Sequence, residues 1–164
     1  MQEDHEIMSQ VNVDSQEGKY LTFQLGKEEY AIEIRFVTEI IGVQKITDIP
    51  DMPSYVKGVI NLRGKVIPVI DVRLRFGFSE REYDERTCIV VVNIQSTSVG
   101  LIVDSVTEVL DIPAEQIDPP PNVNKSAQSR YIIGLGKTGE SVKIILGVDK
   151  ILYDDELERI SQAQ

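Results

Sequence analysis

Histidine, cysteine and tryptophan are scarce in this sequence of 164 residues, which has one histidine, His5, one cysteine, Cys88, and no tryptophan. A single cysteine excludes an internal disulfide and makes a reducing compartment the expected one. Histidine-based triads, cysteine–histidine nucleophiles and metal sites built from several histidines also lack their residues. These shortages argue against enzymatic chemistry, and we predict no catalytic, metal-binding or cofactor-binding residues.

Signals for export and membrane insertion are missing as well. Residues 1–17 contain no lysine or arginine, and the longest unbroken apolar run, residues 88–92, is far too short to span a bilayer. We therefore expect a soluble, cytoplasmic protein. A chain of this length can bury roughly 70% of its unfolded surface, which suffices for one domain or two small ones without a disulfide or metal.

β-branched residues are abundant. Valine and isoleucine together number 40, against 14 for leucine and alanine, and branching at Cβ favours strands over helices. Apolar and polar residues alternate through 20–25 and again through 30–34, on either side of a turn at 26–29. The sequence predicts an all-β fold. Helical turns are expected only near residues 53–56 and 114–117 and in a short C-terminal helix from Asp154.

An internal repeat divides the chain. Residues 37–41 recur as 106–110 at an offset of 69, and residues 55–59 recur as 131–135 at an offset of 76. Residues 66–71 match 144–149 at an offset of 78. This pattern indicates two small β subdomains of similar topology, each closed into a barrel. The alternative is that unrelated β-hairpins share turn chemistry. Arg63 has no arginine at its counterpart in the second copy.

Two motifs suggest chemistry but have simpler interpretations. Residues 134–139 fit the pattern G-x-G-x-x-G, yet a strand follows where a dinucleotide site needs a helix, so we interpret them as a glycine-rich hairpin. Asp71, Asp104 and Asp149 each follow an apolar strand segment. Carboxylates at strand ends can serve a small metal-dependent hydrolase, but aspartate is also a common turn initiator, and we favour the turn.

The formal net charge of −10 is unevenly spread. Residues 1–17 carry −5 and residues 154–164 carry −3, which leaves a nearly neutral body. Four cations lie within 63–75, namely Arg63, Lys65, Arg73 and Arg75, and form either a solvated face or a site for an acidic partner. An alternative function is a nucleic-acid-binding module of the SH3 or OB type. Few aromatic residues and a negative charge disfavour that alternative.

Residues 55–73 resemble the signature of the CheW family, the coupling proteins of bacterial chemotaxis. The resemblance extends over roughly residues 18–153 and includes the turn at 26–30, residues 37–40 and 100–110, and the glycines near 134. Its most specific part is a spaced set of residues in the first copy of the repeat: Lys57, Gly58, Asn61, Leu62, Arg63, Gly64 and Pro68.

The resemblance implies two five-stranded SH3-like barrels packed side by side. On that basis residues 1–17 form an acidic tail and residues 18–153 the folded body. We expect one subdomain over about 18–80 and the other over about 81–153, with ends that cross between them, and then a C-terminal helix and tail over 154–164.

The resemblance also implies a function. Members of the family are adaptors that join the cytoplasmic tip of a chemoreceptor to the regulatory domain of the histidine kinase CheA, at membrane-associated receptor arrays. Carried over by position, the kinase-binding residues are Val37, Glu39 and Gly58. The receptor-binding residues are Arg63, Val106 and Val109.

Overall fold

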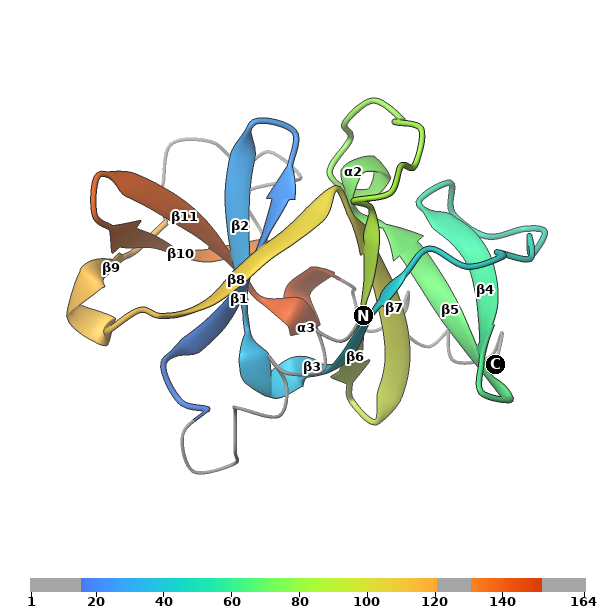
Figure 1. The fold of residues 1–164 in the computed structure, drawn as a ribbon, viewed down its shortest axis with the longest axis horizontal. Coiled ribbons are helices and arrows are strands. Elements are labelled where there is room, and N and C mark those ends of the chain that lie inside the picture. Colours follow the sequence, from blue (N-terminus) through green and yellow to red (C-terminus); the bar gives the residue numbers. More distant parts are fainter. Residues whose placement is uncertain (1–15, 121–130, 152–164) are drawn as a thin grey trace.

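The computed structural model describes residues 16–120 and 131–151, which form two β-sheets (Figure 1). The six-stranded sheet has the order β8-β1-β2-β11-β10-β9, and the five-stranded sheet the order β3-β6-β7-β5-β4. The strands of the first are β1 (Lys19–Leu25), β2 (Glu28–Glu33), β8 (Ser105–Asp111), β9 (Ile117–Asp118), β10 (Ile132–Thr138) and β11 (Ser141–Leu146). Those of the second are β3 (Val37–Gly42), β4 (Val56–Leu62), β5 (Lys65–Asp71), β6 (Cys88–Ile94) and β7 (Thr97–Val103).

The prediction of an all-β fold built from two similar units is confirmed. Leu21, Phe23 and Leu25, the apolar residues of the first alternating segment, are all buried on β1, and the predicted turn joins β1 to β2. The second sheet has the five predicted strands, whereas the first gains a sixth, β9, of two residues. Within the described ranges, the two outer strands of each sheet do not pair with each other.

The two copies of the repeat exchange their first hairpins. Strands β1 and β2 from the start of the chain pair with β8 and β11, while β6 and β7 pair with β3 and β5. The exchange is symmetric, since β2 joins β11 and β5 joins β7 in the only parallel pairings among the strands described. The six-stranded sheet therefore combines residues 19–33 with residues 105–146, and the five-stranded sheet takes residues 37–103. The subdomain bounds of about 18–80 and 81–153, with ends that cross, stay a prediction.

The register corrects one offset of the repeat. The β4–β5 hairpin shifts register between Val56 and Gly58, and the β10–β11 hairpin does so between Ile132 and Gly134, an offset of 76. Asp71 N–H donates to the Tyr55 carbonyl at 2.8 Å, and Gly147 N–H donates to the Tyr131 carbonyl at 2.9 Å, again 76 apart. Residues 66–71 are therefore equivalent to residues 142–147, and the match with 144–149 is wrong by two residues. The sequence does not reveal the error because similar β-branched residues fill both strands.

Short helices follow equivalent strands. Helix α2 (Val72–Arg75) follows β5 and helix α3 (Val148–Ile151) follows β11; neither was predicted from the sequence. The 3-10 helices η2 (Ile34–Phe36) and η3 (Ala114–Gln116) are single turns, and η3 confirms the turn expected near 114–117. Residues 53–56 form one hydrogen-bonded turn that ends where β4 begins. The helix expected from Asp154 and the tail at 1–15 lie outside the described residues.

The largest hydrophobic cluster lies between the two sheets. It contains Phe23 and Tyr30 from the six-stranded sheet, Val90 and Leu101 from the five-stranded sheet, and Phe76 after α2. Separate, smaller clusters lie around Ile60 and Ile67 in the five-stranded sheet and around Ile112 and Ile145 in the six-stranded one. Since the shared cluster is the largest, burial of apolar surface holds the two sheets together as one body.

Candidate functional site

Arg63 stands at the tip of the β4–β5 hairpin. Arg63 and Gly64 occupy the two-residue turn with φ of 52° and 88°, which is the geometry of a type I′ turn. Gly64 N–H donates to the Asn61 side-chain oxygen at 2.8 Å and fixes the turn. The Arg63 side chain is 70% exposed and donates to the Glu39 carboxylate, which raises the pKa of the guanidinium.

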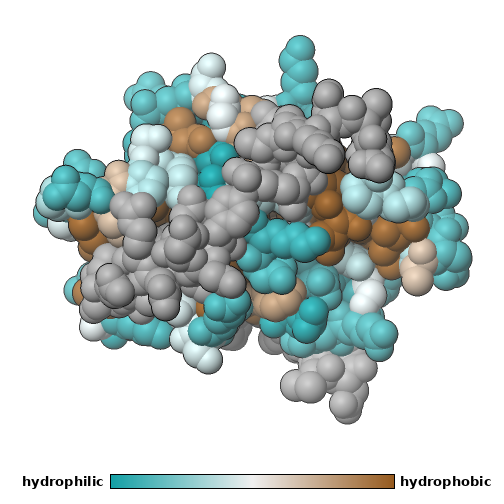
Figure 2. Space-filling model, turned by 180° about the vertical axis from the view of Figure 1, so that it is seen from behind, coloured by the Kyte–Doolittle hydropathy of each residue, from teal (hydrophilic) through white to brown (hydrophobic). Residues whose placement is uncertain are grey.

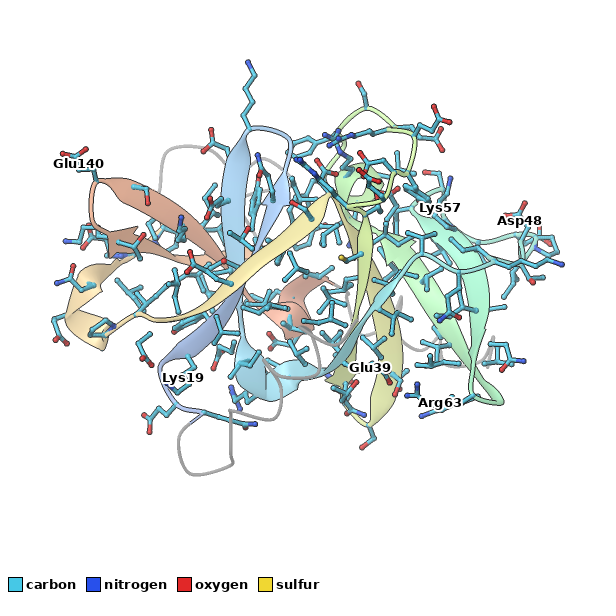
Figure 3. The ribbon with its side chains drawn as sticks, in the orientation of Figure 1. Lys19, Glu39, Asp48, Lys57, Arg63 and Glu140 are labelled. Carbon is cyan, nitrogen blue, oxygen red and sulfur yellow. The ribbon has the colours of Figure 1, made fainter. Side chains whose placement is uncertain are left out.

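The Glu39–Arg63 ion pair links the two edges of the five-stranded sheet. Glu39 lies on β3 and Arg63 follows β4, the first and last strands in the order of that sheet. Figure 3 shows the two side chains next to each other at one end of the sheet. A backbone bridge covers the same outer edge of β4, because Thr47 and Val59 exchange hydrogen bonds of 2.8 and 2.9 Å. The Glu39–Arg63 ion pair and the Thr47–Val59 bridge thus act at the two edges of the five-stranded sheet, which, within the described residues, do not pair with each other as strands.

Gly58 has a structural role at that bridge. Its φ is 142°, and a Cβ atom at this position would lie 2.1 Å from the Thr47 carbonyl oxygen. Only glycine fits, because both the backbone conformation and the space exclude a side chain. Gly58 can therefore shape a binding surface only by allowing the 43–51 segment to lie against β4.

The three predicted valines differ in what they offer to a partner. Val37 is 5% exposed and belongs to the cluster between the sheets, so it has little surface for contact. Val106 and Val109 lie on β8, the outer strand of the six-stranded sheet, and are half-buried against the same cluster. An ion pair joins Glu39 to Arg63, although one of them was assigned to the kinase and the other to the receptor.

The four clustered cations of the sequence point to separate partners. Arg63 binds Glu39, whereas Lys65 donates to the Ser98 hydroxyl at 3.2 Å. Arg73 forms an ion pair with Asp104, and Arg75 lies between two aromatic rings. Each of the four cations therefore has its own partner within the fold, which weakens the interpretation of the sequence cluster as a site for an acidic partner.

Asp104 is the centre of a network at the point where the chain crosses between sheets. Its carboxylate accepts hydrogen bonds from Arg73 Nε and Nη2 at 2.8 and 3.0 Å, from Arg81 Nη1 at 2.9 Å, and from Gly26 N–H at 2.8 Å. Burial, the largest influence, opposes ionisation, but the hydrogen bonds from Arg73 and Gly26 and the charges of both arginines outweigh it and lower the pKa of Asp104. Asp104 is thus more than a turn initiator.

The buried aspartate Asp71 caps a helix. Asp71 accepts from Leu74 N–H at 3.3 Å as the N-cap of α2, which confirms the local role favoured from sequence. The same carboxylate accepts from the Tyr83 hydroxyl at 2.7 Å. Burial, followed by this hydrogen bond, raises the pKa of Tyr83 above its usual range. Both carboxylates therefore hold the 77–87 loop.

Arg75 joins the two sheets, a role that the sequence analysis, which placed it only in the cluster of cations, did not predict. Its guanidinium lies 4.4 Å from the centre of the Tyr55 ring and 4.9 Å from that of Tyr131, residues that precede β4 and β10. Arg75 Nε also donates to the carbonyl of Ile151 at 2.9 Å. The signal available in the sequence was the repeat, which places both tyrosines at equivalent positions.

The described residues offer no other obvious site. In residues 16–120 and 131–151, no three histidine, cysteine, aspartate or glutamate side chains lie together as a metal site would require. None of the helices within those ranges combines the length and apolar character needed to cross a bilayer. Viewed from behind, the surface is mostly hydrophilic, and apolar surface gathers on the side of the six-stranded sheet (Figure 2).

Known proteins resemble this chain over most of its length. The family model described as CheW-like domain matches residues 19–156. Chemotaxis protein CheW of Klebsiella aerogenes is 41% identical over 139 residues, covering 85% of this chain and 84% of that protein. Chemotaxis protein CheW of Treponema pallidum is 33% identical over 153 residues, covering 91% and 90%. The crystal structure of the scaffolding protein TtCheW from Thermoanaerobacter tengcongensis matches with 37% identity and a TM-score of 0.78, covering 85% and 94%.

Replacement of Gly58 tests its structural role. We expect Gly58→Ala to lower the free energy of unfolding by roughly 2–5 kcal/mol, because the new Cβ is both strained and overpacked. Gly64→Ala is the control: φ is also positive there, but apart from the adjacent residues no atom lies within 4 Å of the new Cβ, so the loss is about 1 kcal/mol. Urea unfolding measures both. Equal losses would contradict the close approach to Thr47.

The Asp104 network predicts a pH-dependent stability. Because the folded-state pKa is lowered, the carboxylate stabilises the fold above its unfolded-state pKa, and this contribution disappears as the pH falls through the folded-state value. Asp104→Asn should cost about 2–3 kcal/mol at pH 7 and progressively less below about pH 4. Asp118→Asn, which removes an exposed partner of Lys137 at 3.4 Å, is the control and should cost under about 1 kcal/mol. A pH-independent difference in urea unfolding would refute this role.

Proposed function

The chain belongs to the CheW family, and we propose that it is an adaptor that couples the cytoplasmic tip of a chemoreceptor to the regulatory domain of the histidine kinase CheA. Family membership rests on the match over residues 19–156 and on relatives named as chemotaxis proteins and as a scaffolding protein. On this proposal the protein works in the cytoplasm at receptor arrays and controls the kinase by binding rather than by chemistry.

The observation that best supports two partners is the placement of the predicted residues on two sheets. Glu39 and Gly58 lie on the five-stranded sheet, whereas Val106 and Val109 lie on β8 of the other sheet. Arg63, assigned to the receptor, follows β4 of the five-stranded sheet and contacts Glu39, assigned to the kinase, so the residues assigned to the receptor are divided between the two sheets. One rigid body can therefore hold both partners.

The proposed mechanism is physical. The shared core and the Asp104 network fix the distance between the two surfaces, so an adaptor that binds a receptor and the kinase holds them at a defined separation. Holding both partners raises the effective concentration of kinase at the receptor without any new contact between them. The nucleic-acid alternative has less support, since the four clustered cations have separate partners.

Binding of the full chain to each partner tests the proposal. We expect both the CheA regulatory domain and a chemoreceptor cytoplasmic fragment to bind with dissociation constants no weaker than roughly tens of micromolar, by calorimetry. Arg63→Gly should weaken receptor binding by roughly tenfold and kinase binding by less than about threefold, because the exposed guanidinium is lost while glycine tolerates the positive φ.

The control is Lys137→Ala. Lys137 is a half-exposed cation on β10 that pairs with Asp118 at 3.4 Å; three strands separate it from β8, and it lies on the other sheet from Glu39, so its loss should change neither affinity. If the wild-type chain binds neither partner, the adaptor function is wrong. If Arg63→Gly weakens both partners equally, the assignment of Arg63 to the receptor is wrong while the function stands.

A further inference from the structure

The β1–β2 hairpin lies in a sheet whose other strands come from the far half of the chain. Among the strands described, its partners outside the hairpin are β8 and β11. Figure 1 shows the blue hairpin beside the yellow and orange strands of the second half. A connector of three residues, η2 (Ile34–Phe36), joins it to β3 in the other sheet. The hairpin is thus a separate unit that one short connector attaches to the strands that follow.

Specific contacts hold the hairpin on both of its sides. Toward β8, the buried Thr22 hydroxyl donates to the Glu108 carbonyl at 3.0 Å. Toward β11, the buried Lys143 forms an ion pair with the Glu29 carboxylate. Three apolar side chains of β1 are also buried in the cluster between the sheets. The site between β8 and β11 therefore fits this hairpin in particular, and the identical hairpin of a second copy would make the same contacts.

The two places where the chain crosses between the sheets are held with different firmness. Arg35 in the connector is the counterpart of Asp104, by the offset of 69. The Asp104 side chain is 9% exposed and accepts hydrogen bonds from three other segments of the chain. The Arg35 side chain is 56% exposed and, within the described residues, its ion pair is with Glu33 only two residues earlier. That pair does not tie the connector to another element, so the crossing at 34–36 is the weaker one.

The connector needs little change to become extended. The residues on either side are already extended, with φ and ψ of −62° and 129° at Glu33 and −86° and 123° at Val37. The Val37 N–H closes the single 3-10 turn by donating to the Ile34 carbonyl. Ile34 is buried in the same cluster as the hairpin, so Arg35 and Phe36 are the residues that would straighten. Once straight, the three residues reach about 10 Å, and β2 continues directly toward β3.

We propose that the β1–β2 hairpin of one copy can take the place of the same hairpin in a second copy, which gives a reciprocal hairpin-swapped dimer with its hinge at residues 34–36. Outside the hinge, both forms have the same contacts, so protein concentration decides between monomer and dimer. The inference goes beyond the proposed adaptor function and does not depend on it. In such a dimer, each sheet that carries Val106 and Val109 is completed by the other copy, and each proposed surface is present twice.

A disulfide between β1 and β8 tests the exchange in the full chain. Gln24 is in register with Ser105, and opposed Cα atoms of antiparallel strands lie about 4.5–5.5 Å apart, which suits a disulfide. The chain with Gln24→Cys, Ser105→Cys and Cys88→Ser is unfolded in urea with reductant and refolded at about 5 and 500 μM, because a swapped dimer depends on concentration. Monomer and dimer are then separated by size exclusion and oxidised.

The swapped dimer has a distinct covalent signature. We expect the dimer fraction to rise with the refolding concentration. On a denaturing gel without reductant, the oxidised dimer should run as two linked chains, because residue 24 of one chain then faces residue 105 of the other. The oxidised monomer should run as a single chain. Gln24→Cys in the Cys88→Ser background, without the second cysteine, controls for accidental collisions and should stay unlinked.

Hinge variants test where the exchange begins. Arg35→Pro should raise the dimer fraction several-fold, because proline disfavours the helical conformation of the preceding Ile34 and so opens the 3-10 turn. The matched control is Arg35→Ala, which removes the same ion pair with Glu33 but leaves the backbone free to turn. Its dimer fraction should stay close to that of the parent chain. Equal dimer fractions in the two variants would contradict a hinge at 34–36.

The remaining outcomes decide the proposal. A dimer whose disulfides lie within each chain would show association without exchange and would overturn it. So would the absence of a dimer at the higher concentration in both the parent and Arg35→Pro, or equal linkage in the single-cysteine control. If Arg35→Pro does not fold, the disulfide in the chain with its natural hinge decides alone. Because none of these readouts involves the receptor or the kinase, failure of the exchange leaves the adaptor function standing.

Discussion

The buried carboxylate of Asp104 lies where three parts of the chain meet, and the spacing of the proposed binding surfaces depends on it. Asp104 ends the run through β7 and precedes β8, so it marks the passage from the five-stranded to the six-stranded sheet. It accepts from the β1–β2 turn at Gly26 and from Arg73 and Arg81 beside the other sheet. Without these bonds the Asp104 carboxylate, of which 9% is exposed, and the Arg73 guanidinium, of which 17% is exposed, would each be left as a poorly solvated charge without a partner. Because all these groups are satisfied together, β8 keeps a fixed position relative to β3.

The aromatic and apolar side chains between the sheets add rigidity to this electrostatic joint. Phe76 stacks on Tyr131 with ring centres 5.3 Å apart, contacts Tyr30 at 5.9 Å, and lies next to Arg75 in sequence. The Arg75 guanidinium between Tyr55 and Tyr131 then links equivalent positions of the two repeats. A protein that acts by holding two partners needs such stiffness, because a flexible joint between its surfaces would lower the effective concentration of one partner at the other. The rigidity that these residues give to the fold is therefore also what the proposed function requires.

Local features of the fold could be predicted from the sequence, and long-range ones could not. Alternation and turn residues predicted β1 and β2, and the repeat predicted two similar units, because these patterns arise from neighbouring residues. The exchange of hairpins depends on pairings such as Tyr30 with Ile144, which no local pattern encodes. The site residues came from family resemblance, and the burial of Val37 and the contact between Glu39 and Arg63 emerged only when distant strands were placed together. The partners of Arg73 and Arg75 could not be predicted for the same reason, because they depend on how distant strands are placed.

The exchange of hairpins also bears on how the chain is made. Strands β1 and β2 leave the ribosome before the other strands described, yet β2 lies beside β11, and β1 beside β8, both of which are synthesised much later. An isolated hairpin is only marginally stable in water, so the apolar faces of β1 and β2 stay exposed until their partner strands have been synthesised. The strands β3 to β7, by contrast, are contiguous in the chain and can assemble into the five-stranded sheet beforehand. Translation would thus complete the sheet bearing Glu39 and Arg63 before the sheet bearing Val106 and Val109, and the nascent hairpin would be the segment most in need of protection from aggregation.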